Sequence, residues 1–249
     1  NTHFSLTRKH ERHFAGRLSN VHSSRLVVQP ENRGTAPAIL YSLLRLAKTT
    51  ADATVAFFPS DHYFSDDLSF MNHVDGAFRT IETDPRSIVL LGIEPDAAET
   101  SYGWIEPAKS LFGDLARSVS RVGRFWEKPT SDVAKQLMSS GCLWNSFVMI
   151  GKVETFIDLF RKHLPELFRV FAAASTVFGT EQEMATMRSI YSWIDESNFS
   201  SDVLERSADR LLVMRVGDVG WCDWGEPSRV IDTLASLGVQ TPWMQALAA

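Results

Sequence analysis

The sequence predicts an α/β fold with a mixed, mostly parallel central sheet and helices on both of its faces. Two observations support this prediction. In the first half of the chain, short apolar runs alternate with segments of helical periodicity. The runs are continuously apolar, as strands buried on both faces of a sheet are. The order strand, helix, strand, helix, strand then implies parallel strands joined by helical crossovers.

The first half begins with a charged stretch, residues 7–18, that we expect to be helical. Three strands are predicted, at residues 25–29, 54–58 and 88–93. Two helices separate them, at residues 36–48 and 66–82. In the first of these helices the apolar residues recur at helical spacing. Thr35 is the expected N-cap of this helix, and Pro37 is compatible with its first turn.

The second half is predicted to be rich in strands and then mainly helical. Strands are expected at residues 103–106, 119–127, 143–150, 211–216 and 220–222. Helices are expected at residues 131–139, across 153–191 with an interruption at Pro165, and at 227–237. Gly238 directly follows the closing helix and is a typical stop signal.

Composition narrows the class of protein. The 249 residues carry a net charge of -5, so no overall basic field favours nucleic acid as a partner. No apolar run is long enough to cross a membrane, and we expect no membrane partner. The two cysteines, Cys142 and Cys222, have neither zinc-site spacing nor the density of a disulfide framework. We therefore expect a cytoplasmic protein, in a reducing compartment.

Two aspartates at the ends of distant apolar runs are the best indication of chemistry. Asp61 lies in Phe-Pro-Ser-Asp-His, and Asp223 lies in Trp-Cys-Asp-Trp-Gly. Two carboxylates suit a hard cation such as Mg2+, which assists phosphoryl and nucleotidyl transfer. Asp61 is equally compatible with a turn or a helix N-cap. His62 has no second ligand at useful spacing, so a packed or hydrogen-bonded histidine is favoured over a zinc ligand.

The segment from Gln29 to Thr35 joins a strand to a helix N-terminus, where free N–H groups and Gly34 allow a ligand to approach the backbone. Glu31, like Gln29, can hydrogen-bond the edge of a base, and Arg33 can meet a phosphate. By pattern alone, an ordinary strand-to-helix turn is favoured. Because ligands of open α/β sheets bind beyond the carboxyl ends of strands, Gln29 and Asp61 are both placed for a site.

Three further segments have residues suited to a sugar phosphate. Lys128 precedes Pro129, which is expected to keep it extended at a strand end, where it can meet a phosphate. A solvated Glu–Lys edge is as compatible with this segment. Asn145 can read sugar hydroxyls, or it can simply belong to a strand-entry turn. Gly103 allows a ligand close to the backbone, and Glu106 can accept hydrogen bonds from hydroxyls.

Taken in order, these segments resemble the sugar-phosphate nucleotidyltransferases, in particular the mannose-1-phosphate guanylyltransferases. The matching text is QPENRGTAPAI, FPSDH, YGWIE, FWEKP, LWNS and WCDWG. The resemblance implies a Rossmann-like nucleotidyltransferase fold, with residues 1–240 as the catalytic domain and residues 241–249 as a tail. It implies transfer of a nucleotidyl group from GTP to mannose 1-phosphate, which yields GDP-mannose and pyrophosphate. The oligomeric state is left open, a homo-oligomer included.

The resemblance also assigns roles to residues. It implies that Asp61 and Asp223 hold Mg2+ and that Lys128 binds the sugar phosphate, these three forming the catalytic set. The expected contacts to the sugar phosphate come from Gly103, Glu106, Glu127, Lys128 and Asn145. The expected nucleotide contacts come from Gln29, Glu31, Arg33, Gly34, Thr35 and Ser60. No general base is expected, because a phosphomonoester's second pKa is about 6 and the attacking oxygen is already anionic.

The chain departs from the family pattern in three places. Ser101 and Phe147 stand where glycine is common in the family, and both lie on the expected sugar side. The third departure is the family's opening strand and glycine-rich loop, of the type GGxGTRLxPLS, which the sequence does not contain. We therefore expect a domain that is truncated at its N-terminus. A non-catalytic, nucleotide-sugar-sensing or regulatory protein is the first alternative. A metal-dependent phosphohydrolase is the second, and it would need more ligands near Asp61.

Overall fold

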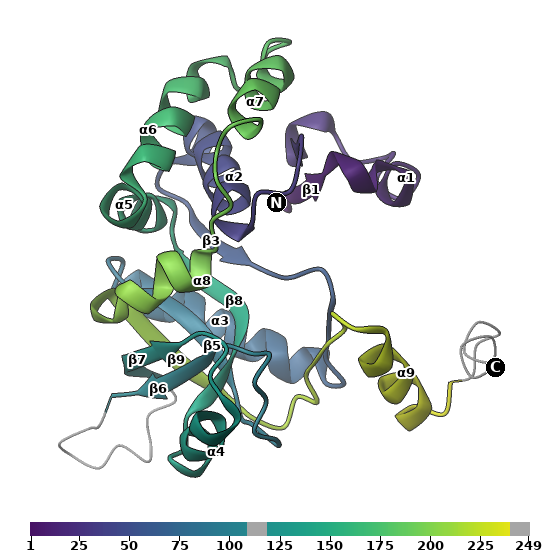
Figure 1. The fold of residues 1–249 in the computed structure, drawn as a ribbon, viewed down its shortest axis with the longest axis vertical. Coiled ribbons are helices and arrows are strands. Elements are labelled where there is room, and N and C mark those ends of the chain that lie inside the picture. Colours follow the sequence, from purple (N-terminus) through teal and green to yellow (C-terminus); the bar gives the residue numbers. More distant parts are fainter. Residues whose placement is uncertain (109–118, 240–249) are drawn as a thin grey trace.

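The computed structural model describes residues 1–108 and 119–239. Its centre is a six-stranded sheet in the order β3-β8-β5-β9-β7-β6 (Figure 1). The bounds of these strands are β3 Thr54–Phe57, β5 Ile88–Ile93, β6 Trp104–Pro107, β7 Val119–Trp126, β8 Leu143–Lys152 and β9 Leu211–Val216. Two small sheets accompany it, β1 (Phe4–Thr7) with β2 (Leu26–Gln29) and β4 (His62–Tyr63) with β10 (Cys222–Asp223). The strands expected from the apolar runs are all confirmed, with small shifts at their ends.

The helices also follow the sequence pattern closely. The longer ones are α2 Thr35–Thr50, α3 Asp67–Thr83, α4 Ser131–Ser139, α5 Val153–His163, α6 Pro165–Ala174, α7 Glu183–Tyr191 and α9 Pro227–Ser236. The short ones are α1 Glu11–Phe14 and α8 Phe199–Asp202. Pro165 ends one helix and opens the next, where its missing N–H costs nothing. Residues 7–18 form less helix than expected, a 3-10 turn followed by α1, and β1 ends at Thr7.

The sheet is mixed, but the expectation that it is mostly parallel is not confirmed. In the part of this sheet that the structure describes, β5 and β9 form the one parallel pair. The other pairings are antiparallel, because β8 runs back between β3 and β5 and because β6 and β7 lie side by side as an antiparallel pair. Apolar runs show that strands are buried, but they carry no information on strand direction, so the sequence could not reveal the reversal of β8.

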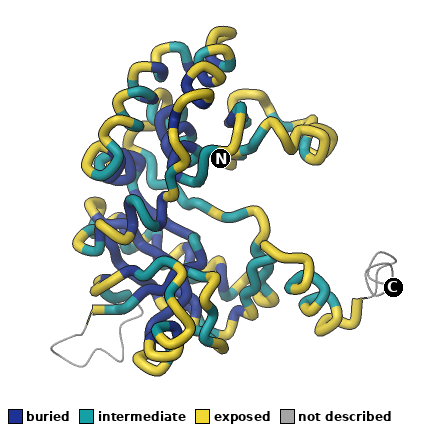
Figure 2. Tube along the Cα trace, in the orientation of Figure 1, coloured by how far each residue is buried: buried dark blue, intermediate teal, exposed yellow. Residues whose placement is uncertain are grey.

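Helices cover both faces of the sheet, as expected. Alternate residues of β5 divide between two cores, with Ile88 and Leu90 in one and Val89 and Leu91 in the other. The first core is completed by α2 and α5–α8, and the second by α3 and α4. Figure 2 shows the buried residues running through the middle of both layers. Every side chain of β5 is therefore inside, as a continuously apolar strand requires.

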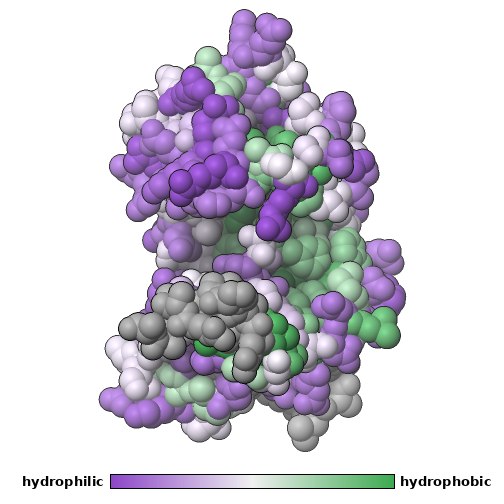
Figure 3. Space-filling view, turned by 90° about the vertical axis from the view of Figure 1, so that its right-hand side faces the viewer, coloured by the Kyte–Doolittle hydropathy of each residue, from purple (hydrophilic) through white to green (hydrophobic). Residues whose placement is uncertain are grey.

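Strand β3 differs from this pattern because it lies at the edge of the sheet. Its residues are half-buried, not buried on both faces as expected. Phe58, which follows it, is 50% exposed. Strand β2 pairs with β1 and does not join the six-stranded sheet. Figure 3 faces the side of the molecule on the right of Figure 1, and hydrophobic residues gather there at mid-height, in a hollow between the upper and lower parts.

Helix α9 stands out from the body at the C-terminal end of the described chain (Figure 1). None of its residues is buried, and Figure 2 shows it in the colours of exposed and half-buried residues. Gly238 follows it with a φ of 68°, which agrees with its expected role as a stop signal. Residues 241–249, the expected tail, lie outside the described residues. Among the described helices, none is long and apolar enough to span a membrane.

Candidate active site

The two aspartates predicted to form a pair are brought together by β4 and β10. These short strands are antiparallel, and Asp223 lies opposite His62 in their register. The backbone N–H of Trp224 donates to the carbonyl oxygen of Asp61 over 2.6 Å. Asp61 is exposed in the turn that precedes β4. Segments far apart in the sequence therefore meet here as neighbouring backbones.

The carboxylate of Asp223 is held by two residues that the sequence analysis did not select. Oδ1 of Asp223 accepts a hydrogen bond from the Tyr102 hydroxyl at 2.5 Å and another from the Arg229 guanidinium. Burial and the hydrogen bond to Asp223 raise the pKa of Tyr102, so the hydroxyl keeps its proton. Tyr102 lies in the recognised YGWIE segment, but no spacing rule pointed to Arg229, which lies beyond Asp223 on the following helix.

His62 is a packed, hydrogen-bonded residue and not a general base. Its Nδ1 accepts from the indole N–H of Trp221 at 3.2 Å, and the two rings lie edge to face. Burial lowers the pKa of His62, although the charges of Asp61 and Asp223 act in the opposite direction. The ring is therefore neutral at pH 7. This agrees with the interpretation favoured for His62 from the sequence.

Two of the residues expected to contact a sugar phosphate, Asn145 and Glu127, lie next to a third, Gly103. The backbone N–H of Asn145 donates to the carbonyl oxygen of Gly103 at 2.8 Å. On the other side, a Cβ on Gly103 would lie 3.0 Å from Oε2 of Glu127, so this carboxylate passes close to the backbone. Tyr102, the preceding residue, reaches Asp223. One continuous stretch of chain thus links the aspartate pair to the expected sugar contacts.

The strand around Asn145 is irregular, and Phe147 is the reason. Strand β8 bulges against β5, where the register shifts between Leu90 and Gly92. Phe147 has a φ of 60°, the left-handed conformation that favours glycine. The Asn145 side-chain oxygen accepts from the Phe147 N–H at 3.1 Å. Asn145 is only 9% exposed, and its amide nitrogen is the group left to donate to a ligand.

Lys128 and Glu127 stand at the end of β7 as expected, but their backbone does not follow the expected path. Lys128 has a φ of 46°, so the expectation that Pro129 keeps it extended is wrong. The chain turns sharply between the strand end and Pro129, and the Lys128 side chain is exposed. Burial raises the pKa of Glu127, Lys128 opposes this shift, and Glu205 adds to it. Burial of Glu127 therefore disfavours its ionised form.

Glu106 lies apart from this cluster. It is two residues beyond Trp104 on the same side of β6, which faces the second core, whereas Ile105 faces the first. The Glu106 carboxylate accepts from the indole N–H of Trp126 at 3.2 Å. The side chain therefore points to the opposite face of the sheet from Glu127 and Asn145. The structure does not bring Glu106 together with the other expected sugar contacts.

The segment expected to bind the nucleoside is held by a second loop. Gly34 has a φ of 86°, and a Cβ there would lie 2.2 Å from the carbonyl oxygen of Ser197. Thr35 is the first residue of α2, not its N-cap, because Gly34 takes the cap position. The Thr35 hydroxyl oxygen accepts from the Phe199 N–H at 2.8 Å. Pro37 falls in the first turn, as expected.

The polar side chains of this turn are largely engaged with their own surroundings. Gln29 is 5% exposed and accepts from the Tyr191 hydroxyl at 3.1 Å. Arg33 donates to the Tyr191 carbonyl at 2.9 Å and pairs with Glu31 at 3.0 Å. These contacts are those of a well-built strand-to-helix turn, and they leave the exposed Glu31 as the accessible carboxylate. Ser60 is exposed beside Asp61, on the other segment.

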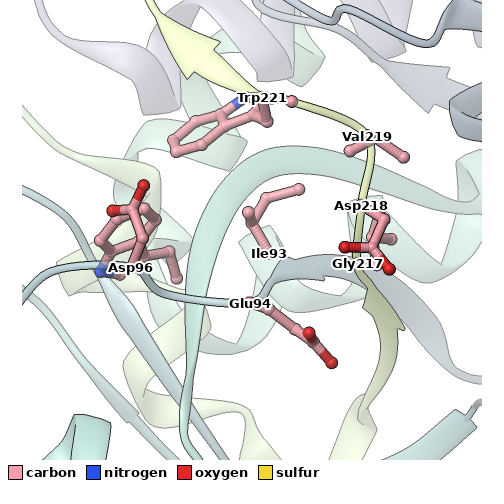
Figure 4. Close-up of a pocket in the computed structure, with 10 residues that line it drawn as sticks. Ile93, Glu94, Asp96, Gly217, Asp218, Val219 and Trp221 are labelled. Atoms are coloured by element: carbon pink, nitrogen blue, oxygen red, sulfur yellow. The ribbon is translucent and has the colours of Figure 1, made fainter.

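An open pocket of about 160 Å3 lies behind Trp221, at the carboxyl ends of the parallel strands β5 and β9 (Figure 4). In this view Asp96 and Asp218 lie on either side of Ile93, with Trp221 above. Its charged lining is acidic, with Glu94 the third carboxylate. A triphosphate would be repelled here.

The donor set at the aspartate pair fits a hard cation that completes its shell with ligand oxygens. Asp61 and Asp223 supply carboxylate oxygens, as Mg2+ prefers. In the described parts of the chain, no group of three or more His, Cys, Asp or Glu side chains could hold a metal by itself. Two protein carboxylates are a donor set that Mg2+ can complete with phosphate oxygens.

Comparisons of the sequence with known proteins agree on one family. The chain matches the model of the nucleotidyl transferase family over residues 4–238. The xanthan biosynthesis protein XanB of Xanthomonas campestris pv. campestris is 28% identical over 221 residues, which are 85% of this chain and 44% of XanB. The mannose-1-phosphate guanylyltransferase ManC of Salmonella typhimurium is 26% identical over 232 residues, 91% of this chain and 46% of ManC. The chain thus spans about half the length of the curated relatives it matches.

Solved structures share the fold. A Thermus thermophilus protein described as a mannose-1-phosphate geranyltransferase matches with a TM-score of 0.75 and 25% identity, over 95% of this chain and 64% of that one. A mannose-6-phosphate isomerase from Helicobacter pylori matches with a TM-score of 0.69 and 20% identity, over 88% of this chain and 84% of that one. The second likeness concerns the fold alone.

Proposed function

The chain belongs to the nucleotidyl transferase family, and we propose that it transfers a nucleotidyl group from GTP to mannose 1-phosphate, giving GDP-mannose and pyrophosphate. The observation that carries this proposal is the continuity of the site around Tyr102 and Gly103. Tyr102 contacts Asp223 of the aspartate pair, and Gly103 contacts Asn145 and adjoins Glu127. The proposed cation site and the proposed sugar contacts are therefore connected through two adjacent residues of one chain segment.

The identity of the substrates rests on the relatives. Several of them are named mannose-1-phosphate guanylyltransferases, and others are named for the biosynthesis of xanthan and alginate. These names together favour GTP, mannose 1-phosphate and a place in polysaccharide biosynthesis. We include a cytoplasmic location in the proposal, since Cys142 is buried and both cysteines are free. A homo-oligomer is compatible with it.

Asp61 and Asp223 are the residues that would hold Mg2+, which would offset the negative charge that builds up at the α-phosphate. Around it, the protein positions the two substrates. Lys128, an exposed cation at the end of β7, is placed to bind the phosphate of the sugar. Asn145 and Glu127 are placed to donate to and accept from sugar hydroxyls. The neutral His62 supports Trp221 and carries no proton in the reaction.

The phosphate oxygen of mannose 1-phosphate needs no activation by a base, because it is ionised at neutral pH. The protein's contribution is therefore orientation and charge neutralisation. This mechanism requires cations and amide donors near the sugar phosphate and carboxylates near the metal. In this proposal, Lys128 and Asn145 meet the first requirement and the two aspartates meet the second.

One observation favours a second candidate, a non-catalytic protein that senses a nucleotide sugar. Arg229 forms an ion pair with Asp223 and so gives this carboxylate a cation that belongs to the protein. A site balanced in this way can bind a nucleotide sugar without a metal. The same sugar contacts would then serve recognition only.

A substrate screen separates the two candidates. Pyrophosphate release is measured with each of the common nucleoside triphosphates against several hexose 1-phosphates, with and without Mg2+. The enzyme proposal predicts Mg2+-dependent release, fastest with GTP and mannose 1-phosphate. The sensing alternative predicts no release with any pair but measurable binding of GDP-mannose by calorimetry. Release of inorganic phosphate would contradict both.

A further inference from the structure

Arg229 joins the exposed helix α9 to the centre of the site. Its guanidinium donates to Asp223, to the Tyr102 hydroxyl and to the Ser101 hydroxyl, the last at 2.9 Å. A carboxylate oxygen of Glu99 lies 3.6 Å away. The guanidinium also stacks on the Tyr102 ring, 4.6 Å from its centroid. Although it belongs to a helix without buried residues, the Arg229 side chain is only 20% exposed.

The helix that carries Arg229 has few other attachments. Within the described chain, its one other side-chain hydrogen bond to a residue outside α9 runs from the Trp224 indole to the Thr233 hydroxyl, at 3.2 Å. Figure 1 shows α9 projecting from the body after β10, and Figure 2 shows that no part of it is buried. The position of α9 thus depends strongly on the contacts of Arg229 with Asp223, Tyr102 and Ser101.

A divalent cation and Arg229 compete for the same carboxylate. Oδ1 of Asp223 is already shared by Tyr102 and Arg229, and a cation on Asp223 would place two positive charges side by side. The guanidinium has other partners at hand in Ser101 and Glu99, which are themselves hydrogen-bonded at 3.0 Å. It can therefore leave Asp223 without losing every partner. Ser101, where the family commonly has glycine, supplies one of these contacts.

We propose that Arg229 is an exchangeable counter-ion of Asp223, which occupies the carboxylate in the cation-free protein and yields it to a divalent cation, loosening α9 as it leaves. This inference rests on the cation site of the proposed function, but it concerns the protein's own response to the cation. It treats Arg229 as a positioning residue, since the residue acts through Asp223.

The first test measures the affinity for Mn2+, a stand-in for Mg2+ that is detected directly by electron paramagnetic resonance. Arg229→Gln removes the charge and keeps a hydrogen-bonding side chain. Loss of the competing cation is expected to tighten Mn2+ binding about tenfold. The matched control is Arg169→Gln, which removes an equal charge from an exposed pair with Glu166 and should leave the affinity unchanged. Unchanged or weaker binding in Arg229→Gln would overturn the proposal.

The second test follows hydrogen exchange in the peptide that covers α9, with and without Mn2+. In the wild-type protein, Mn2+ is expected to speed exchange in α9. In Arg229→Gln, exchange is expected to be fast from the start and insensitive to Mn2+. Slower exchange, or no change while Mn2+ is bound, contradicts the proposal. Turnover in the substrate screen is measured separately. The proposed function can therefore hold when this inference fails, and this inference can hold when the proposed function fails.

Discussion

The backbone N–H of Trp224 donates to the carbonyl oxygen of Asp61, and this 2.6 Å hydrogen bond joins the two segments that carry the aspartates. It extends the pairing of β4 with β10 by one step. Because the bond is made by backbone atoms, the closeness of the aspartates follows from the fold and does not depend on their own side chains. Substitution of Asp61 should therefore test chemistry with little effect on folding, whereas substitution of Asp223 also changes its contacts with Tyr102 and Arg229.

Lys128→Ala should weaken the binding of mannose 1-phosphate far more than that of GTP. Lys128 is exposed at the end of β7, so its loss removes a charge without opening the core. The loss of one charged hydrogen bond predicts a rise in KM for mannose 1-phosphate on the order of tenfold or more. Steady-state kinetics with each substrate varied in turn gives both constants. Lys135→Ala, an exposed lysine of α4, is the control and should behave as wild type. Equal effects on both substrates would argue against the assigned role.

Asn145→Asp should raise the KM for mannose 1-phosphate while the fold is retained. An aspartate can still accept from the Phe147 N–H, as the Asn145 oxygen does now. The amide donor is replaced by a negative charge, which repels a phosphorylated sugar. We expect a KM increase on the order of tenfold. The melting temperature serves as the control on folding. An unchanged KM in a folded variant would remove Asn145 from the sugar site.

Glu127→Gln should stabilise the protein at neutral pH. Burial raises the pKa of Glu127, so the folded state binds the proton more tightly than the unfolded state does. Stability from this group is full below the ordinary carboxyl pKa and is lost as the pH rises through the raised value. The variant should therefore melt higher than wild type at pH 7, and this difference should vanish at low pH. A variant that is less stable at pH 7 would show that the carboxylate is favourably placed.

Gly34→Ala should be strongly destabilising. At this position φ is 86°, and a Cβ would lie 2.2 Å from the Ser197 carbonyl oxygen. The backbone must shift, and the expected loss is on the order of 3 kcal/mol in the free energy of unfolding. Urea denaturation measures it. Gly16→Ala is the matched control, since a Cβ there meets nothing within 4 Å. Equal stability of the two variants would mean that the contact with Ser197 yields easily.

Much of the fold could be predicted because the hydrophobic periods of strands and helices can be recognised in short stretches of sequence. The apolar run Ile88–Ile93 has every residue buried, and the helical spacing of α2 places Ile39, Leu40 and Leu43 in the core. Strand direction and edge position are not local properties. The antiparallel direction of β8 and the edge position of β3 could therefore not be predicted from the sequence.

The same distinction between local and non-local features applies to the candidate site. Asp61, Asp223, Gly103 and Asn145 were selected from recognisable segments, and the structure pairs the segments of the first two and the backbones of the last two. Arg229 could not be found in this way, because its contacts with Asp223 and Ser101 depend on how α9 leaves the sheet. The conformation of Lys128 was also missed, since the general preference of residues before proline is overridden by the turn at the end of β7.

We propose that Asp61 and Asp223 jointly coordinate the divalent cation for nucleotidyl transfer. Pyrophosphate release from GTP and mannose 1-phosphate, measured across a Mg2+ titration for wild type, Asp61→Asn and Asp223→Asn, tests this role directly. We predict release that requires Mg2+ in the wild type and falls on the order of 100-fold or more in each variant. Undiminished, Mg2+-dependent release in Asp223→Asn would contradict it.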